Sequence, residues 1–587
     1  MTDASRDARA SAEPVPVSAE SPLVGAPPPV RARHLGELRA EQPLFAPTSA
    51  HPLELLPTRD RLLRTLLGHR RVVLGRSDHD QVWGWLGTVV VVLVAAAVRL
   101  WQLGRPHTLV FDETYYVKDA YTLWNLGFEA QWPPEPNPAF EAGQVDTYLD
   151  QAAYVVHPQV GKWLIALGIQ LGGGAESSTA WRLASAVAGI VAVFLLIRIA
   201  RRLFASTAMG LVAGLLLAVD GEAIVHSRTA LLDQFLMLFV LIAFGCLLMD
   251  REWARRRLAE RVAAIVDAGV AGTGRTSLLY GPRLGFRWWR LAAGVSLGLA
   301  CGVKWSGVYF LAVFGILTVA WDMAARRSAG VRRWWEDSLL ADGVPAFLQM
   351  VPTAVVVYVA SWWSWFATPG AYMRQWAAQN PGQGVTWLPE ALRSFTHYHA
   401  EMWRFHTTLD SDHAYKASPI GWIVQWRPTS FYWQSDDPGV GDCPVTATSR
   451  CAAAITSLGN PLLWWLAALA IVAVVVLGVT RRDWRAVAVL SGTVAGWLPW
   501  FQYLDRTVFT FYSIVFTPWV VLTLVYVGVI ALEHTERRPR RHRTVILVIG
   551  LVVAAICAVS AAFYPLWTAE QVSFDYWRNV VRLPSWV

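Results

Sequence analysis

Long stretches of apolar residues dominate the sequence from position 84 onward. Eleven of them approach or reach the roughly 20 residues that a helix needs to cross about 30 Å of hydrocarbon. They lie at residues 84–103, 180–199, 206–220, 231–249, 289–303, 305–322, 344–366, 461–479, 485–502, 508–531 and 543–563. The pattern predicts an all-α polytopic membrane protein, with about eleven transmembrane helices in one domain over residues 81–564.

Clusters of arginine predict the orientation of these helices. The clusters lie at residues 198–202, 251–257, 326–333, 481–482 and 537–543. With the N-terminus inside, every cluster falls on the cytoplasmic side, as the positive-inside rule requires. Residues 104–179 and 367–460 then form two long external loops, and residues 565–587 are external. We expect a multi-pass plasma-membrane protein with a cytoplasmic N-terminus and an extracytoplasmic C-terminus.

Residues 1–80 contain no long apolar stretch and are rich in Ala, Pro, Ser and Arg. Such a composition cannot bury enough apolar surface to fold, and it lacks the apolar core of a signal peptide. We expect a largely disordered cytoplasmic tail. Within it, residues 52–75 combine leucines with arginines and could form a basic amphipathic helix on the membrane surface.

The composition agrees with a membrane protein and disfavours a nucleic-acid partner. Only 16% of the residues are charged, against about 25% in soluble domains, and the mean hydropathy is +0.34. The net charge of +8 is accounted for by the arginine clusters, and no aromatic-basic RNA motif is found. Cys443 and Cys451 share one external loop and could form a disulfide there in an oxidising compartment.

The acidic pair Asp112–Glu113 is the first candidate for chemistry. It follows the first apolar segment and lies among apolar and aromatic residues. Carboxylates in such surroundings are costly to desolvate unless they have partners or a function. The structural alternative is a helix N-cap followed by a first-turn acid.

Further polar residues that hydropathy does not require fall on the same external face. They are His157, Asp220, Glu222, His226, Arg228, Asp233, Lys304 and Arg506. Converging acids and bases near the membrane surface are what an active site for a lipid-linked substrate needs.

Structural alternatives apply to several of these residues. Arg228 and Asp233 could form an ion pair, and Lys304 could extend from a helix end toward water. His157 precedes a proline and could simply start a helix. A metal site among the histidines of residues 397–406 is disfavoured, because no closed ligand set can be named.

Five short motifs, in order over residues 100–580, resemble those of protein O-mannosyltransferases. They are Phe111-Asp112-Glu113, His157-Pro158 with Gly161-Lys162, Ser227-Arg228 with Leu231-Leu232-Asp233, Gly302-Val303-Lys304-Trp305-Ser306-Gly307, and His413-Ala414-Tyr415-Lys416-Ala417-Ser418 with Trp422. Two departures stand out. Gln159 occupies the position of a second proline in the family, and the second loop has no room for the β-trefoil (MIR) domain of the eukaryotic enzymes. The chain therefore resembles a bacterial, actinobacterial member.

The resemblance implies a GT-C glycosyltransferase bundle with its site on the extracytoplasmic face. It implies transfer of mannose, with inversion, from polyprenyl-phosphate mannose to Ser or Thr hydroxyls of secreted proteins. The expected partners are this donor, acceptor polypeptides near the secretion translocon, and membrane lipids. No cofactor and no metal are expected, and the lipid-linked donor is a substrate.

The resemblance also suggests roles for individual residues. Asp112 is the expected general base, while Glu113 orients the acceptor peptide or holds nearby cationic groups. The expected phosphate-binding residues are Arg228, Lys304 and Arg506. The expected acceptor or sugar contacts are His157, Asp233, His413 and Tyr415.

Two other functions fit the same pattern less well. One is a different GT-C transferase that uses a polyprenyl-phosphate sugar on a glycan or lipid acceptor. The other is a lipid or sugar transporter. Many transporters contain internal repeats and line both halves of the bilayer with polar residues. This sequence shows no repeat, and its polar residues gather on one face.

Overall fold

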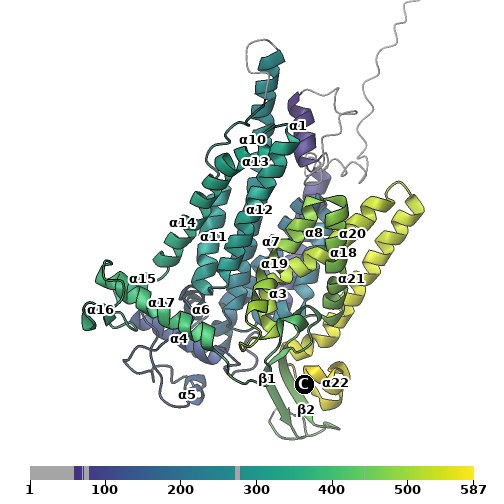
Figure 1. Cartoon of the computed structure of the whole chain (residues 1–587). Helices are drawn as coiled ribbons and strands as arrows, with labels where there is room; N and C mark the ends of the chain where they lie inside the picture. The colour runs from purple at the N-terminus through teal and green to yellow at the C-terminus, as the bar shows by residue number, and fades with distance from the viewer. Residues whose placement is uncertain (1–57, 69–70, 72–73, 75–77, 271–277, 442) are drawn as a thin grey trace, which may run out of the picture.

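Helices make up most of the structure. The computed structural model describes residues 58–587 except 69–70, 72–73, 75–77, 271–277 and 442. Long helices run side by side, and the segments from residues 104–179 and 367–460 gather at one end of the bundle (Figure 1). We call this the loop end, and the other the opposite end.

Within the described residues, eight helices are long and apolar enough to cross a membrane. They are α3 (Asp78–Leu100), α7 (Ser178–Phe204), α10 (Asp233–Val270), α12 (Gly307–Ser328), α14 (Val344–Ala360) with the turns before it, α18 (Pro461–Arg481), α20 (Thr517–Thr535) with the turn before it, and α21 (Pro539–Trp567). A ninth is added if the bent pair α8 (Thr207–Val219) and α9 (Gly221–Ser227) counts as one span.

All eleven predicted apolar segments lie on helices. Three of these helices are too short to meet the length criterion alone: α8, α11 (Trp288–Val303) and α19 (Trp484–Trp497). The chain is thus a largely helical, multi-span membrane protein with eight or nine long spans among the described residues. Another short apolar helix, α6 (Val160–Leu171), lies within the first long loop.

The bend between α8 and α9 is built around Asp220. Its Oδ1 caps α9 by accepting a hydrogen bond from the Ala223 amide at 3.1 Å. Its Oδ2 accepts bonds from the Asn460 amide and the Trp464 indole, each at 3.0 Å. The carboxylate therefore satisfies backbone groups that a helix break would leave unpaired, which gives Asp220 a structural role.

The spans differ in how far the protein surrounds them. In the most apolar part of α20, 78% of the residues are buried inside the protein, against 11% for α21. Close packing around α20 needs a small residue on its neighbour α19. A Cβ at Gly492 would lie only 1.9 Å from the Trp519 ring. Glycine at this position lets the two helices approach.

The loop end contains short helices and a small sheet. The helices are α4 (Glu113–Leu126), α5 (Asn137–Glu141), α15 (Trp363–Ala367), α16 (Trp376–Gln379), α17 (Glu390–Thr408) and α22 (Phe574–Val580), with 3-10 turns η3 (Pro419–Val424), η4 (Leu498–Gln502), η5 (Thr510–Phe516) and η6 (Pro584–Trp586). The strands are β1 (Thr429–Asp436), β2 (Cys451–Ser457) and β3 (Val572–Ser573), antiparallel in the order β1-β2-β3.

This sheet corrects the all-α prediction. β1 carries adjacent Phe431, Tyr432 and Trp433, and such side chains favour a pleated, half-buried surface. We missed the strand because the loop was assigned from hydropathy alone. The same region contains the disulfide between Cys443 and Cys451, which the shared loop suggested.

The N-terminal segment forms a helix that packs against α10. Helix α1 (Thr58–Leu67) lies within the predicted amphipathic stretch. Its buried Leu63 and Leu66 pack against Leu258 and Val262, because α10 extends far enough at the opposite end to receive them. The apolar side of α1 therefore covers α10. Residues 1–57 of the predicted tail lie outside the described part of the chain.

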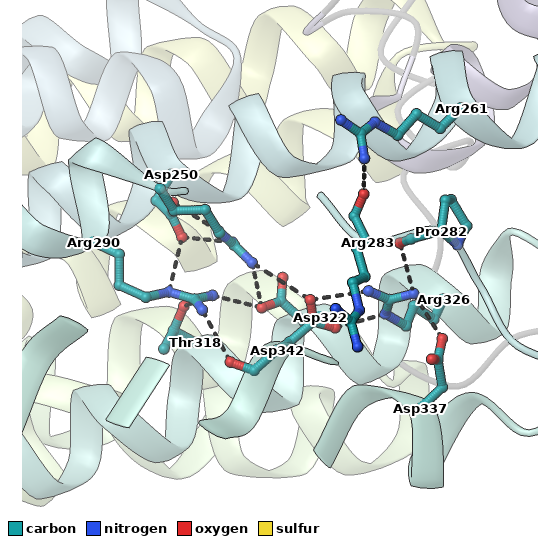
Figure 2. A network of polar contacts seen from close by, with 11 residues as sticks. Asp250, Arg261, Pro282, Arg283, Arg290, Thr318, Asp322, Arg326, Asp337 and Asp342 are labelled. Atoms are coloured by element: carbon teal, nitrogen blue, oxygen red, sulfur yellow. Dashed lines mark hydrogen bonds and ion pairs between the residues drawn. The ribbon is translucent and has the colours of Figure 1, made fainter. Parts of the chain in front are cut away.

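A buried network of ion pairs joins helices at the opposite end (Figure 2). Arg287 pairs with Asp250 at 2.5 Å and with Asp322 at 2.6 Å, and Arg290 also reaches Asp322 at 2.6 Å. Arg326 binds two acids of the segment formed by α13 (Trp334–Ser338) and the π-helical η2 (Leu339–Gly343). The network thus connects α10, α11 and α12 to the start of α14.

Candidate active site

A polar cavity of about 150 Å³ lies at the loop end, between α12, α17, η4 and η5. Its polar lining comes from His157, Asp233, Lys304, His406, Arg506 and Tyr512. The lining also includes apolar residues such as Phe310 and Val515. The cavity therefore combines fixed charges with apolar side chains that come from the membrane helices.

Asp112 lies beside this cavity, at the start of α4. The preceding Phe111 has φ +49°, a conformation uncommon for a residue other than glycine, and it turns the chain sharply. Asp112 occupies the N-cap position, yet its side chain makes no capping bond. Its Oδ2 lies 3.4 Å from the Tyr116 hydroxyl, longer than a usual O–H···O bond. The capping alternative therefore does not account for this carboxylate.

The surroundings of Asp112 disfavour its charged form. Burial raises its pKa to about 6, with Lys304 acting in the opposite direction and Asp233 in the same direction. A carboxylate with such a pKa is ionised at neutral pH and accepts a proton more readily than an ordinary aspartate. Asp112 thus has the electrostatics of a general base.

Glu113, the next residue, has quite different surroundings. It is fully buried, and its two oxygens accept bonds from Arg182 at 2.8 and 2.9 Å. They also accept the backbone amides of Ala230 at 2.8 Å and Val110 at 3.0 Å. Glu113 thus ties the loop before α4 to α7 and to the turn before α10. Both carboxylate oxygens of Glu113 are occupied by these contacts, so neither is left to bind an acceptor peptide. The cationic group that Glu113 binds is Arg182.

Arg182 was not among the predicted site residues. An arginine near the start of the apolar helix α7 is costly unless it is paired, and that was the available signal. Besides Glu113, its guanidinium reaches the carbonyls of Leu103, Pro106 and Thr108. Arg182 therefore organises the backbone that leads to Asp112.

Lys304 and Asp233 form the central ion pair of the cavity. Lys304 Nζ lies 2.7 Å from Asp233 Oδ2 and 5.3 Å from the centre of the Tyr512 ring. Burial acts against the lysine charge, but Asp233, Tyr512 and Asp112 together outweigh it, so the pKa of Lys304 is raised. The pair forms because Asp233 begins α10 and Lys304 follows α11, two helices packed side by side.

Arg228, a predicted phosphate-binding residue, does not line this cavity. Its guanidinium donates to the carbonyls of Arg99 at 3.0 Å, Trp101 at 2.7 Å and Gln102 at 2.9 Å. These are carbonyls at the end of α3, which the helix itself leaves unpaired. Arg228 does not line the cavity and pairs with backbone rather than Asp233. The structure therefore does not place it at a phosphate site.

Arg506 lines the cavity and is held by His406. Arg506 Nε donates to the His406 carbonyl at 3.0 Å, and Nη2 lies 3.4 Å from His406 Nδ1. His406 Nε2 lies 2.8 Å from the Val156 carbonyl, so Nε2 carries the proton and Nδ1 can accept. Within the described structure, Arg506 Nη1 is buried without a hydrogen-bond partner. Arg506 thus offers a donor to a ligand.

His157 packs beside His406 as a neutral ring. The two rings stack with centroids 5.3 Å apart, and the Tyr116 ring lies 6.2 Å away. Burial and the nearby Lys304 hold the pKa of His157 well below its usual value. Burial likewise lowers the pKa of His406 to about 4. Neither imidazole therefore adds positive charge to the cavity at neutral pH.

His413 and Tyr415 do not line the cavity. The edge of the His413 ring meets Phe509 at 5.0 Å and Phe111 at 6.4 Å. The Tyr415 amide donates to His413 Nδ1 at 3.1 Å, and its ring stacks under Arg427 at 5.3 Å. The structure therefore places His413 next to the turn that positions Asp112, with Tyr415 behind it.

A buried triad braces the segment that carries His157. Lys162 Nζ lies 2.9 Å from Glu129 and 3.2 Å from Asp119. Gln159 donates to Glu129 at 3.1 Å and accepts from Ser364 at 3.0 Å. Gln159, the residue that departs from the family motif, is thus a polar bridge from the triad to α15. Neither acid of the triad was predicted.

The described residues contain no group of three or more His, Cys, Asp or Glu arranged to hold a metal ion. Within the segment considered for a metal, His399 Nε2 lies 2.6 Å from the Tyr358 hydroxyl, and His397 lies 3.4 Å from Glu401. His406 lies near Arg506, so His397, His399 and His406 each contact a different partner.

Comparison with known proteins now adds to this geometry. The family description "Dolichyl-phosphate-mannose-protein mannosyltransferase" matches residues 156–280 and, in a second version, 276–367. The "C-terminal four TMM region of protein-O-mannosyltransferase" matches residues 391–586. Together these matches cover most of the chain beyond α3.

Whole-length relatives are found among actinobacteria. The polyprenol-phosphate-mannose–protein mannosyltransferase of Mycolicibacterium smegmatis is 37% identical over 523 residues, covering 86% of this chain and 94% of the relative. That of Mycobacterium tuberculosis is 36% identical over 517 residues, covering 86% and 92%.

A solved structure shares the fold. The Saccharomyces cerevisiae protein O-mannosyltransferase Pmt1-Pmt2 complex bound to the sugar donor superposes with a TM-score of 0.65 at 14% sequence identity. The match covers 86% of this chain and 92% of that chain.

Fold and site together define a multi-span membrane glycosyltransferase. The chain belongs to the polyprenol-phosphate-mannose–protein mannosyltransferase family.

Proposed function

We propose that this protein transfers mannose from polyprenyl-phosphate mannose to Ser or Thr hydroxyls of polypeptides. Family membership supports the donor and the acceptor class. The structural observation that supports it best is the cavity whose lining combines Lys304 and Arg506 with apolar side chains, with the carboxylate of Asp112 close to Lys304. Two cations suit the donor phosphate, and the apolar side chains suit its lipid.

The reaction is a single displacement at the anomeric carbon of the mannose. The acceptor oxygen forms a bond to that carbon as the bond to the phosphate oxygen breaks, and the configuration inverts. Asp112 takes the hydroxyl proton, and the polyprenyl phosphate leaves with the bonding electron pair. Negative charge grows on the phosphate as it leaves, and the fixed cations Lys304 and Arg506 stabilise that charge.

The neighbouring residues have supporting roles in this proposal. Asp233 holds Lys304 in place, and His406 holds Arg506. Glu113 and Arg182 are positioning residues, because they fix the backbone around Asp112 from a fully buried site. Trp305 and Trp403 line the cavity and offer aromatic faces to the sugar.

We further propose that the site faces the extracytoplasmic side of the plasma membrane and that the eleven apolar helices all belong to the membrane domain. The arginine clusters support this topology, because all of them fall on the cytoplasmic side when the N-terminus is inside. The disulfide Cys443–Cys451 at the loop end supports it further, since disulfides persist in oxidising compartments. Secreted polypeptides are then the acceptors.

The direct test uses purified protein, polyprenyl-phosphate [14C]mannose and a Ser/Thr-rich peptide. We expect label in the peptide, lost when its Ser and Thr are replaced by Ala. A glycan or lipid acceptor is offered in parallel reactions. Transfer to one of these with none to the peptide would overturn the protein-acceptor proposal. Transfer to no acceptor, with labelled donor carried across vesicle membranes, would indicate a transporter instead.

A further inference from the structure

A second and larger recess opens at the loop end, separate from the polar cavity. It has a volume of about 920 Å³ and is lined by residues 102–108 and one face of strands β1 and β2, together with Ala569 and Gln571. The β1 residues that line it are Tyr432, Gln434 and Asp436, which alternate along the strand and so share a face. We call this recess the sheet groove.

The walls of the sheet groove lead to Asp112. Residues 102–108 run directly into the turn at Phe111, whose ring stacks on Phe431 of β1 with centroids 4.7 Å apart. One wall therefore continues into the turn before Asp112, and the other wall is the strand on which that turn packs. Asp112, the next residue, lies close enough to Lys304 and Asp233 of the polar cavity for their charges to act on its carboxylate.

The chemistry of the sheet groove differs from that of the polar cavity. Most of its polar side chains are neutral hydrogen-bonding groups, including Gln102, Thr108 and Gln434. Arg105 and Asp436 carry opposite charges, so the groove has no excess of cations for a phosphate. Neutral donors and acceptors along an extended recess suit the backbone amides and hydroxyls of a polypeptide.

The β1 side chains are already ordered into a row. The Tyr432 hydroxyl donates to Gln434 Oε1, and Gln434 Nε2 donates to Asp436 Oδ2 at 2.8 Å. Adjacent Ser435 lies on the other face of the strand. The row is therefore preorganised, which lowers the entropic cost of holding a ligand. Gln434 is its central member.

We propose that the sheet groove binds the acceptor polypeptide in an extended conformation and leads the target hydroxyl to Asp112. This inference rests on the proposed function and adds where the acceptor binds. The donor then enters from the polar cavity and the acceptor from the groove, and they meet at the turn formed by Phe111 and Asp112.

A binding experiment tests the groove without requiring transfer. In the Gln434→Cys variant, the rate of labelling by a water-soluble maleimide is measured with and without a twelve-residue Ser/Thr-rich peptide. The wild type, with free cysteines at 246, 301 and 557, supplies the background. We expect the peptide to slow labelling and polyprenyl phosphate to leave it unchanged. Equal rates with and without the peptide would overturn the proposal, whether or not the enzyme transfers mannose.

A kinetic experiment tests whether a substitution in the sheet groove weakens acceptor binding and leaves donor binding unchanged. Gln434→Trp places a bulky ring in the middle of the groove, and Ser435→Ala on the opposite face of β1 is the matched control. For the long peptide we expect Gln434→Trp to raise KM about tenfold or more, with the KM for donor unchanged. A tripeptide acceptor, too short to occupy the groove, should be unaffected. A changed KM for donor, or an equal loss with both peptides, would contradict the assignment.

Discussion

At the scale of single residues, the adjacent carboxylates Asp112 and Glu113 have different surroundings. Glu113 is enclosed by Arg182 and two backbone amides, and Asp112 has only a long contact to Tyr116. A fully paired carboxylate is a poor proton acceptor, whereas one that burial has pushed toward its neutral form is a better one. These surroundings support the proposal that Asp112 accepts the proton and that Glu113 positions the backbone around it.

The assignment of Asp112 predicts a pH dependence. Burial raises its pKa to about 6, so the carboxylate is ionised above that pH and protonated below it. The value of kcat/KM should be level above neutral pH and fall progressively as the pH drops through about 6. Asp112→Asn should keep donor binding and lose about two to four orders of magnitude in transfer rate. A variant that kept near-normal turnover, or the same pH profile, would exclude Asp112 as the base.

Two arginines predicted as equivalent should behave differently. Arg506→Ala removes a cation with an unpaired N–H in the cavity, so the KM for donor should rise about tenfold or more. Arg228→Ala removes bonds to three carbonyls at the end of α3, so the melting temperature should fall while the KM for donor stays the same. Donor titrations and thermal unfolding in detergent separate the two. An opposite pattern would return Arg228 to the phosphate site.

At the scale of elements, the ion network at the opposite end holds α10, α11 and α12 together. The buried carboxylate of Asp322 forms ion pairs with both Arg287 and Arg290 (Figure 2). Arg326, which belongs to an arginine cluster that predicted orientation, is itself buried and paired with Asp342 and Asp337. Part of the positive-inside signal is thus neutralised within the fold.

Asp322→Asn tests this network. The substitution leaves two buried guanidinium groups short of a counter-charge, and breaking a buried pair typically costs about 3–5 kcal/mol. We expect a clearly lower melting temperature, with the KM values of the folded enzyme unchanged because the active site lies at the other end. The control is Arg333→Ala, which breaks an exposed pair with Glu336 and should change little. Equal melting temperatures of the two variants would contradict the role of the network.

At the scale of the whole molecule, the arginine-rich segments and the candidate site lie at opposite ends of the helix bundle. The arginine-rich segments and the ion network lie at the opposite end, and the cavity, the sheet groove and the disulfide lie at the loop end. This separation agrees with the proposed topology, in which the arginine-rich segments are cytoplasmic and the site faces the extracytoplasmic side.

Labelling of cysteines in intact cells tests the proposed orientation. Gln383 lies in an exposed segment at the loop end, and Arg537 lies in an exposed turn between α20 and α21. Each is replaced by cysteine in a separate variant, Gln383→Cys or Arg537→Cys. A membrane-impermeant maleimide should label the first in intact cells and the second only after permeabilisation. The reverse pattern would invert the topology, and labelling of both in intact cells would contradict the number of spans between them.

Much of the protein could be predicted from its sequence, because the signals involved are local. Length and hydropathy place every long span, since each helix satisfies its own backbone hydrogen bonds within lipid. The motifs pointed to Asp112 and Lys304, and the predicted topology pointed to Arg506. The structure places Lys304 and Arg506 in one cavity, with Asp112 close to Lys304. The strands of the sheet were missed, because their pairing joins segments as far apart as Cys451 and Ser573, and no local pattern reports such a contact.

The sequence by itself determined the membrane class, the positions of the apolar helices, the family and four polar residues of the cavity: His157, Asp233, Lys304 and Arg506. Only the tertiary structure decided which charges are paired with which. It joined Lys304 rather than Arg228 to Asp233, enclosed Glu113 with Arg182, and placed a polar sheet beside the turn at Phe111. The physical reason is that hydrophobicity is a property of each segment, whereas the pairing of buried charges depends on which helix ends meet in space.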